Sequence, residues 1–130
     1  MAEITAYRVQ DQRFGLGNLL DEDRMSFAMS GDDELARRGV SCMEDLSNLA
    51  AYIAVMGIEA TVPALVRVTG VLSEDTPVDE EFGEILLIAS DAEIITDDDA
   101  FFSLVGDLVD LYYEQGLSFE DLREIASDRI

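Results

Sequence analysis

Residues 92–116 read AEIITDDDAFFSLVGDLVDLYYEQG, and the spacing of their apolar residues changes at the three adjacent aspartates. The β-branched residues before Asp97 are typical of a strand. After the aspartates, apolar residues recur every three or four positions up to Gly116, which predicts an amphipathic helix that the glycine ends. We predict that Asp97 is the N-cap of this helix. Asp98 and Asp99 are then expected in its first turn, where their charge complements the helix dipole.

Two further helices carry capping signals. Ser41 and Glu44 have the spacing of a capping box, so we predict that a helix begins there and continues to Gly57. Ser118 and Asp121 have the same spacing and are predicted to open the last helix of the chain.

Strands are predicted where apolar and polar residues alternate or where β-branched residues gather. These segments are 3–9, 61–72 and 84–96, the last as one or two strands with a bend at Asp91. A short helix is predicted at 31–39. The order of the elements predicts one α+β domain spanning the whole chain, in which about four helices pack on a small, mostly antiparallel sheet of three or four strands.

The composition is strongly acidic. The chain of 130 residues has 29 acidic and 8 basic residues, no histidine, and a net charge of −21. A small domain usually carries a net charge of magnitude about 2–8, so self-repulsion is expected to destabilise the compact state here. Either a basic partner or an environment of high salt, which screens the charges, would offset this repulsion.

The charge is unevenly distributed along the chain. Residues 1–72 contain 11 acidic residues and 6 arginines, whereas residues 73–130 contain 18 acidic residues and 2 arginines. Adaptation to high salt is expected to spread acidic residues over the whole surface, because every patch needs hydration. The concentration of acids in the second half therefore favours a surface that meets a basic partner.

The predicted partner-binding residues all lie in this second half. On the predicted helix, Asp107, Asp110 and Glu114 share one face, and Asp99 and Ser103 continue the line. Neighbouring positions in such a line are about 4.5–6 Å apart along the axis, which is of the same order as the spacing of phosphates along a nucleic-acid strand. The complete predicted set is Glu80, Glu81, Glu84, Asp97, Asp98, Asp99, Asp107, Asp110 and Glu114.

The composition disfavours catalytic, metal and nucleic-acid sites. Without histidine the chain lacks the commonest general base and metal ligand, and its single Cys42 has no histidine to activate it. The acidic runs at 21–23, 32–34 and 97–99 lack the alternating acids and central glycine of a calcium loop. Direct nucleic-acid binding needs an extended cationic surface. We expect no enzyme activity, no metal or other cofactor, and no direct binding to nucleic acid or membrane.

These features predict an inhibitor that mimics nucleic acid and occupies the basic DNA- or RNA-binding surface of a partner protein. A viral anti-restriction or anti-CRISPR protein would have this physical character. Two alternatives stay open: a domain of a salt-adapted organism that is acidic for solubility, and an enzyme that uses carboxylates. No signal peptide or long apolar run is visible, so we expect a cytoplasmic protein, in the host cytoplasm if it is viral. Formation of a homodimer is left open.

Overall fold

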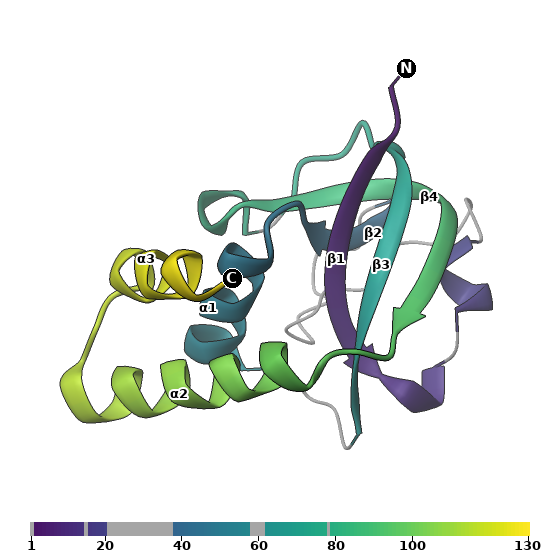
Figure 1. The fold of residues 1–130 in the computed structure, drawn as a ribbon. Coiled ribbons are helices and arrows are strands. Elements are labelled where there is room, and N and C mark those ends of the chain that lie inside the picture. The colour runs from purple at the N-terminus through teal and green to yellow at the C-terminus, as the bar shows by residue number, and fades with distance from the viewer. Residues whose placement is uncertain (1, 15, 21–37, 58–61, 78) are drawn as a thin grey trace.

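The computed structural model of this protein describes residues 2–14, 16–20, 38–57, 62–77 and 79–130. The strands of these residues form a closed antiparallel barrel in the order β1-β2-β4-β3 (Figure 1). Their bounds are β1 (Ile4–Asp11), β2 (Val40–Met43), β3 (Pro63–Leu72) and β4 (Glu84–Ile95). The α-helices are α1 (Leu46–Met56), α2 (Asp99–Gln115) and α3 (Phe119–Arg129). The short 3-10 helices are η1 (Gln12–Phe14), η2 (Gly17–Leu20) and η3 (Glu80–Phe82).

The predicted fold class, a small sheet packed by about four helices, is wrong. β1 and β4 each pair with both β2 and β3, so every strand has two neighbours and the sheet closes on itself. The three α-helices of the described residues stand together at one side of this barrel (Figure 1). Alternation of apolar residues predicts where strands occur but not which strands pair, so local patterns do not reveal the closure.

The barrel closes because β4 is long and bends at a bulge. The register between β3 and β4 shifts at Thr69/Gly70, and Ser90 of β4 is the extra residue. Such a bulge bends its strand and increases the local twist. A Cβ on Gly70 would lie 2.2 Å from the carbonyl oxygen of Ile88, so the close approach of the strands requires glycine there. The segment is therefore one continuous strand, with its irregularity one residue before the bend predicted at Asp91.

The capping box predicted at Ser41 and Glu44 is wrong. Ser41 lies in the buried strand β2, and α1 begins later, at Leu46. Its N-cap is Asp45, whose side chain accepts a hydrogen bond from the backbone N–H of Ser47 at 2.9 Å. Pairing of β2 with β1 and β4 overrides the local capping pattern. The predicted end of the helix is confirmed, because the N–H of Gly57 donates to the last turn of α1.

The ends of α2 and α3 largely agree with the sequence signals. The N-cap of α2 is Asp98, one residue after the predicted Asp97, and Asp99 lies in the first turn as predicted. Gly116 ends α2 in the left-handed conformation, which glycine adopts without strain. The capping box of Ser118 and Asp121 at the start of α3 is confirmed.

Several predicted features fall outside the described residues. They are the acidic runs at 21–23 and 32–34 and nearly all of the helix predicted at 31–39.

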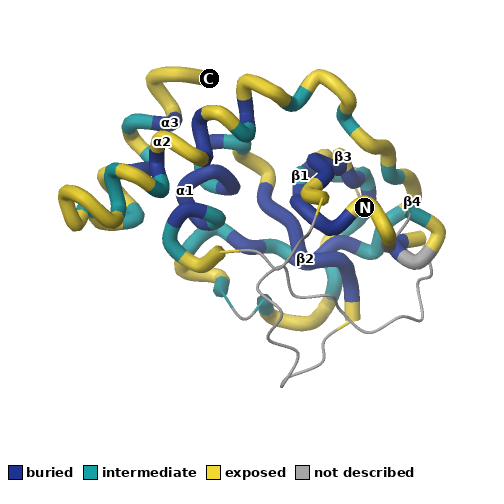
Figure 2. The backbone as a smooth tube through the Cα atoms, turned by 90° about the horizontal axis from the view of Figure 1, so that it is seen from below, coloured by how far each residue is buried: buried dark blue, intermediate teal, exposed yellow. Residues whose placement is uncertain are grey.

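Among the described residues, the buried apolar side chains form two clusters. One fills the barrel and includes Ala6, Val66 and Leu87. The other lies between the barrel and the helices, and α1 is its centre, because Leu49 and Tyr52 are fully buried there. Figure 2 shows α1 and β2 mostly buried, whereas buried and exposed residues alternate along α2 and α3. As a result, α2 has one face in the core and one face in solvent.

Candidate partner-binding surface

The outer face of α2 carries a row of exposed carboxylates, which we call the α2 acidic row: Asp99, Asp107, Asp110 and Glu114. The opposite face of the helix is buried, and Leu104 and Leu108 anchor it in the core. The row extends over about 22 Å at 1.5 Å per residue. The predicted line of acids on this helix is thus present at the surface, held on a rigid element.

One member of the α2 acidic row is paired. Nη1 of Arg129, from α3, lies 2.8 Å from Oδ2 of Asp107, and both side chains are about half exposed. An exposed pair of this kind stabilises the fold by about 0–1 kcal/mol. In the described part of the chain, no arginine pairs with Asp110 or Glu114. The row therefore keeps most of its negative charge available to a partner.

Glu80 and Glu81 do not join this row. Both are exposed on η3, the turn just before β4. In Figure 1 this turn lies above α1, whereas α2 runs below α1. The structure therefore divides the predicted set between two surfaces, and only the part on α2 forms an extended row.

The three adjacent aspartates have different surroundings. Asp97 is exposed and lines a pocket between the barrel and the helices. Asp98 is half-buried at the N-cap of α2, and its side chain accepts no hydrogen bond from the first turn. Asp99 is exposed and heads the α2 acidic row. The three side chains of this predicted run therefore differ in exposure and in their neighbours.

Glu84, also in the predicted partner-binding set, is buried, unlike the exposed carboxylates of the α2 acidic row. Its carboxylate accepts hydrogen bonds from the Ser41 hydroxyl and, at 2.8 Å, from the backbone N–H of Asp79. The hydroxyl of the buried Tyr52 donates to the Asp79 carboxylate at 2.6 Å. These contacts form a polar network that joins α1 and β2 to the start of β4. The sequence showed Glu84 only as one more acid in an acidic segment.

Arg8 completes this network from β1. Its Nη1 donates to the backbone carbonyl of Ser41 at 3.0 Å, and its charge attracts that of Glu84. Burial lowers the pKa of Arg8 to about 10, an effect that Cys42 and Glu84 partly offset.

Cys42, the nucleophile considered from the sequence, is fully buried, as is the neighbouring Ser41. Burial raises the pKa of the Cys42 thiol to about 12, although the charge of Arg8 opposes this rise. The thiol therefore stays protonated at neutral pH and is unsuited to nucleophilic attack.

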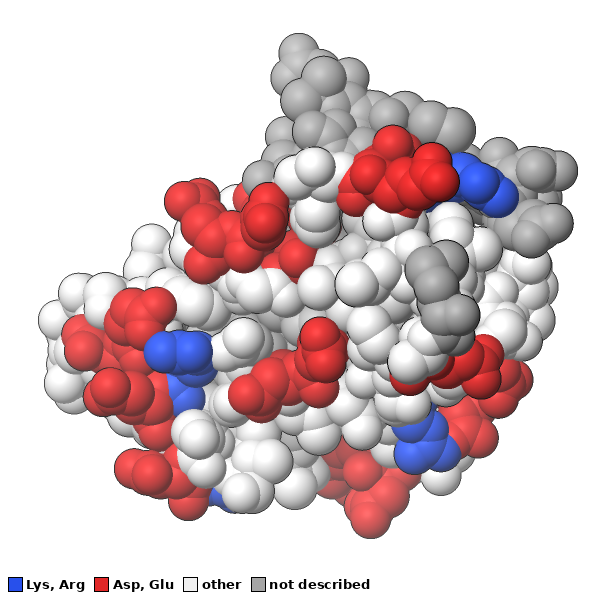
Figure 3. All heavy atoms as spheres, turned by 90° about the horizontal axis from the view of Figure 1, so that it is seen from above, with Lys and Arg blue, Asp and Glu red and all other residues white. Residues whose placement is uncertain are grey.

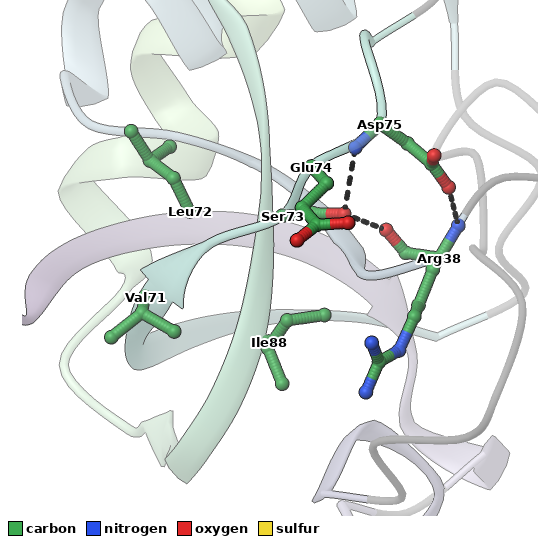
Figure 4. Close-up of a pocket in the computed structure, with 7 residues that line it drawn as sticks. All are labelled: Arg38, Val71, Leu72, Ser73, Glu74, Asp75 and Ile88. Carbon is green, nitrogen blue, oxygen red and sulfur yellow. Dashed lines mark hydrogen bonds between the residues drawn. The ribbon is translucent and has the colours of Figure 1, made fainter. Parts of the chain in front are cut away.

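Hydrogen bonds join the acidic loop after β3 to the segment before β2 (Figure 4). The Ser73 hydroxyl donates to the carbonyl of Arg38 at 2.6 Å, and the N–H of Arg38 donates to the Asp75 carboxylate at 2.7 Å. The guanidinium of Arg38 points away from these contacts, across a hollow of about 260 Å³. Asp75 and the neighbouring Glu74 are both exposed, and Asp75 has a structural role through its hydrogen bond from Arg38.

The acidic side chains are not confined to one patch. Figure 3 shows several separate groups of acidic side chains on one face of the molecule, with few basic ones between them. No group of three or more acidic or cysteine side chains suited to a metal ion occurs among the described residues. None of the helices in the described ranges is both long and apolar enough to span a lipid bilayer.

Comparisons with protein families, with curated proteins and with solved structures found no match to this chain.

Proposed function

We propose that this protein binds a basic surface of a nucleic-acid-binding protein through the α2 acidic row and thereby competes with nucleic acid. One observation carries the proposal: exposed carboxylates recur along a single rigid helix of 17 residues whose other face is anchored in the core. Such a row presents several negative charges along one line, as a phosphate backbone does.

The proposed inhibition requires binding to the partner but no catalytic reaction. The strong negative field should steer association with a cationic groove, so the association rate should fall steeply as salt is added. Occupancy of the groove would block the nucleic acid that the partner normally binds. A viral inhibitor of restriction or CRISPR proteins is the biological setting that we propose for such an activity.

The test is capture of a partner followed by competition. The tagged protein would be incubated with host lysate at low salt, and each captured protein would be purified and tested for DNA or RNA binding by gel shift. We expect the chain to displace nucleic acid from the captured protein at stoichiometric concentrations. If the captured protein binds nucleic acid equally well with this chain present, the mimicry proposal is wrong.

A second candidate is adaptation to high salt without mimicry, which the spread of acidic groups in Figure 3 favours. The two candidates differ in how stability depends on salt, so thermal melts followed by circular dichroism over a series of NaCl concentrations separate them. A salt-adapted domain should be unfolded in about 0.1 M NaCl. The screening length there is about 10 Å, so repulsion between neighbouring charges is only partly screened. We expect a cooperative melt at that concentration. Absence of a folded baseline there would favour salt adaptation.

A further inference from the structure

A pocket of about 480 Å³ lies where the barrel meets the first turn of α2 and the end of α3. Its volume falls within the range of about 300–1,000 Å³ that is typical of small-molecule sites. The walls are mainly apolar and come from β1, β3, β4, α1 and α2. The apolar side chains of these walls include Tyr7, Leu46, Leu65, Ile95, Phe101 and Leu104.

More arginine than carboxylate side chains line this pocket. Arg67 from β3 and Arg129 from α3 line it, and Asp97 is the one carboxylate side chain among its described lining residues. In the whole chain, acidic residues outnumber arginines by 29 to 8. On a protein with this excess of acids, a pocket lined by two guanidiniums and one carboxylate favours an anionic group beside the guanidiniums.

Both arginines can donate to a further acceptor. Arg67 pairs with Glu93, and Arg129 pairs with Asp107. A guanidinium has five N–H donors, so one carboxylate partner does not saturate it. Their side chains are 45% and 44% exposed, which leaves them accessible from solvent.

The N-terminus of α2 adds positive potential at the same place. Ala100 and Phe101, in the first turn of this 17-residue helix, line the pocket. The side chain of the N-cap Asp98 accepts no hydrogen bond from the first-turn amides. The positive end of the helix dipole favours an anionic group there, and the carboxylates of Asp98 and Asp99 offset part of this effect.

We propose that this pocket binds a small amphipathic anion, with an apolar body against the barrel and the helices and a single carboxylate or sulfonate between Arg67 and Arg129. The apolar walls disfavour a polyanion such as a nucleotide triphosphate, because most of its charge would have no partner there. The site is separate from the α2 acidic row and does not depend on the proposed mimicry.

The test uses dodecanoate, titrated into the folded protein by isothermal titration calorimetry in about 0.15 M NaCl, where long-range repulsion from the net charge is screened. We expect saturable binding with one site per chain. Arg67→Gln and Arg129→Gln should each weaken binding about tenfold, as expected for loss of a hydrogen bond to a charged group. Ala100→Trp should fill the pocket and abolish binding, whereas Asp97→Asn should strengthen it.

Arg123→Gln is the matched control. Arg123 is also on α3, is 42% exposed, and pairs with a carboxylate, but it does not line the pocket. It changes the net charge by the same amount as the two test variants, so its affinity should equal that of the unmodified protein. Circular dichroism would establish that each variant is folded. Absence of saturable binding, or equal affinities in the Arg67, Arg129 and Arg123 variants, would overturn the proposal.

Discussion

Replacement of Glu84 by alanine should lower the free energy of unfolding by about 2–3 kcal/mol, as expected when buried donors lose a charged hydrogen-bond acceptor. The substitution leaves the charge of Arg8 buried without its attraction to Glu84. It also removes the acceptor for the Ser41 hydroxyl and for the N–H of Asp79. Urea unfolding followed by circular dichroism measures the change. A domain of this size is stable by only about 5–15 kcal/mol, so the unfolding midpoint should shift clearly.

Glu80→Ala is the matched control for this prediction. Glu80 is exposed on η3, a few residues before Glu84, and its loss should change stability by no more than about 0.5 kcal/mol. Glu84→Gln keeps the shape and one acceptor oxygen but removes the charge, so an intermediate loss is expected. A loss below about 1 kcal/mol for Glu84→Ala would show that the network contributes little beyond one ordinary hydrogen bond.

Charge reversal of the α2 acidic row should weaken binding to the partner by several kcal/mol, which is about a hundredfold or more in affinity. The variant replaces Asp107, Asp110 and Glu114 by lysine, and all three side chains are exposed. The fold should persist, because the substitutions lower the large net negative charge and disturb only the exposed pair with Arg129. The measurement is the affinity for the captured partner at fixed salt, with circular dichroism to verify folding.

The neighbouring helix supplies a matched control. Glu120, Glu124 and Asp128 are exposed on α3, and Glu120 pairs with Arg123 at 2.7 Å, as Asp107 pairs with Arg129. Replacing these three residues by lysine changes the net charge by the same amount. We expect only a modest loss of affinity from this control. Equal losses in the two triple variants would mean that binding responds to total charge, and the α2 acidic row would not be the site.

Sequence patterns whose interactions lie within a single helix predicted most helix ends of this chain correctly. The predicted ends of α1 at Gly57 and of α2 at Gly116 are confirmed, as is the capping box of Ser118 and Asp121. These features depend on backbone conformation and on hydrogen bonds a few residues away, so short patterns contain the necessary information. The α2 acidic row could be predicted in the same way, because the helical period alone determines which residues of α2 face outward and which are buried.

Features that depend on residues distant in the sequence could not be predicted from local patterns. The spacing of Ser41 and Glu44 imitates a capping box, yet Ser41 lies in a strand that pairs with residues more than forty positions away. Glu84 could be distinguished from its acidic neighbours only once β2 and β1 had placed Ser41 and Arg8 beside it. The pocket between Arg67 and Arg129 likewise forms from elements that are far apart in the chain.

The amino-acid sequence alone was enough to predict a strongly acidic chain of strands and helices, most of the helix ends, and a row of carboxylates on one helical face. Closure of the barrel, burial of Glu84 and the separation of η3 from α2 all depend on pairing between strands distant in the sequence. The physical reason is the range of the interactions. Helix periodicity and caps act over a few residues, whereas strand pairing and burial are decided by the packing of the whole chain.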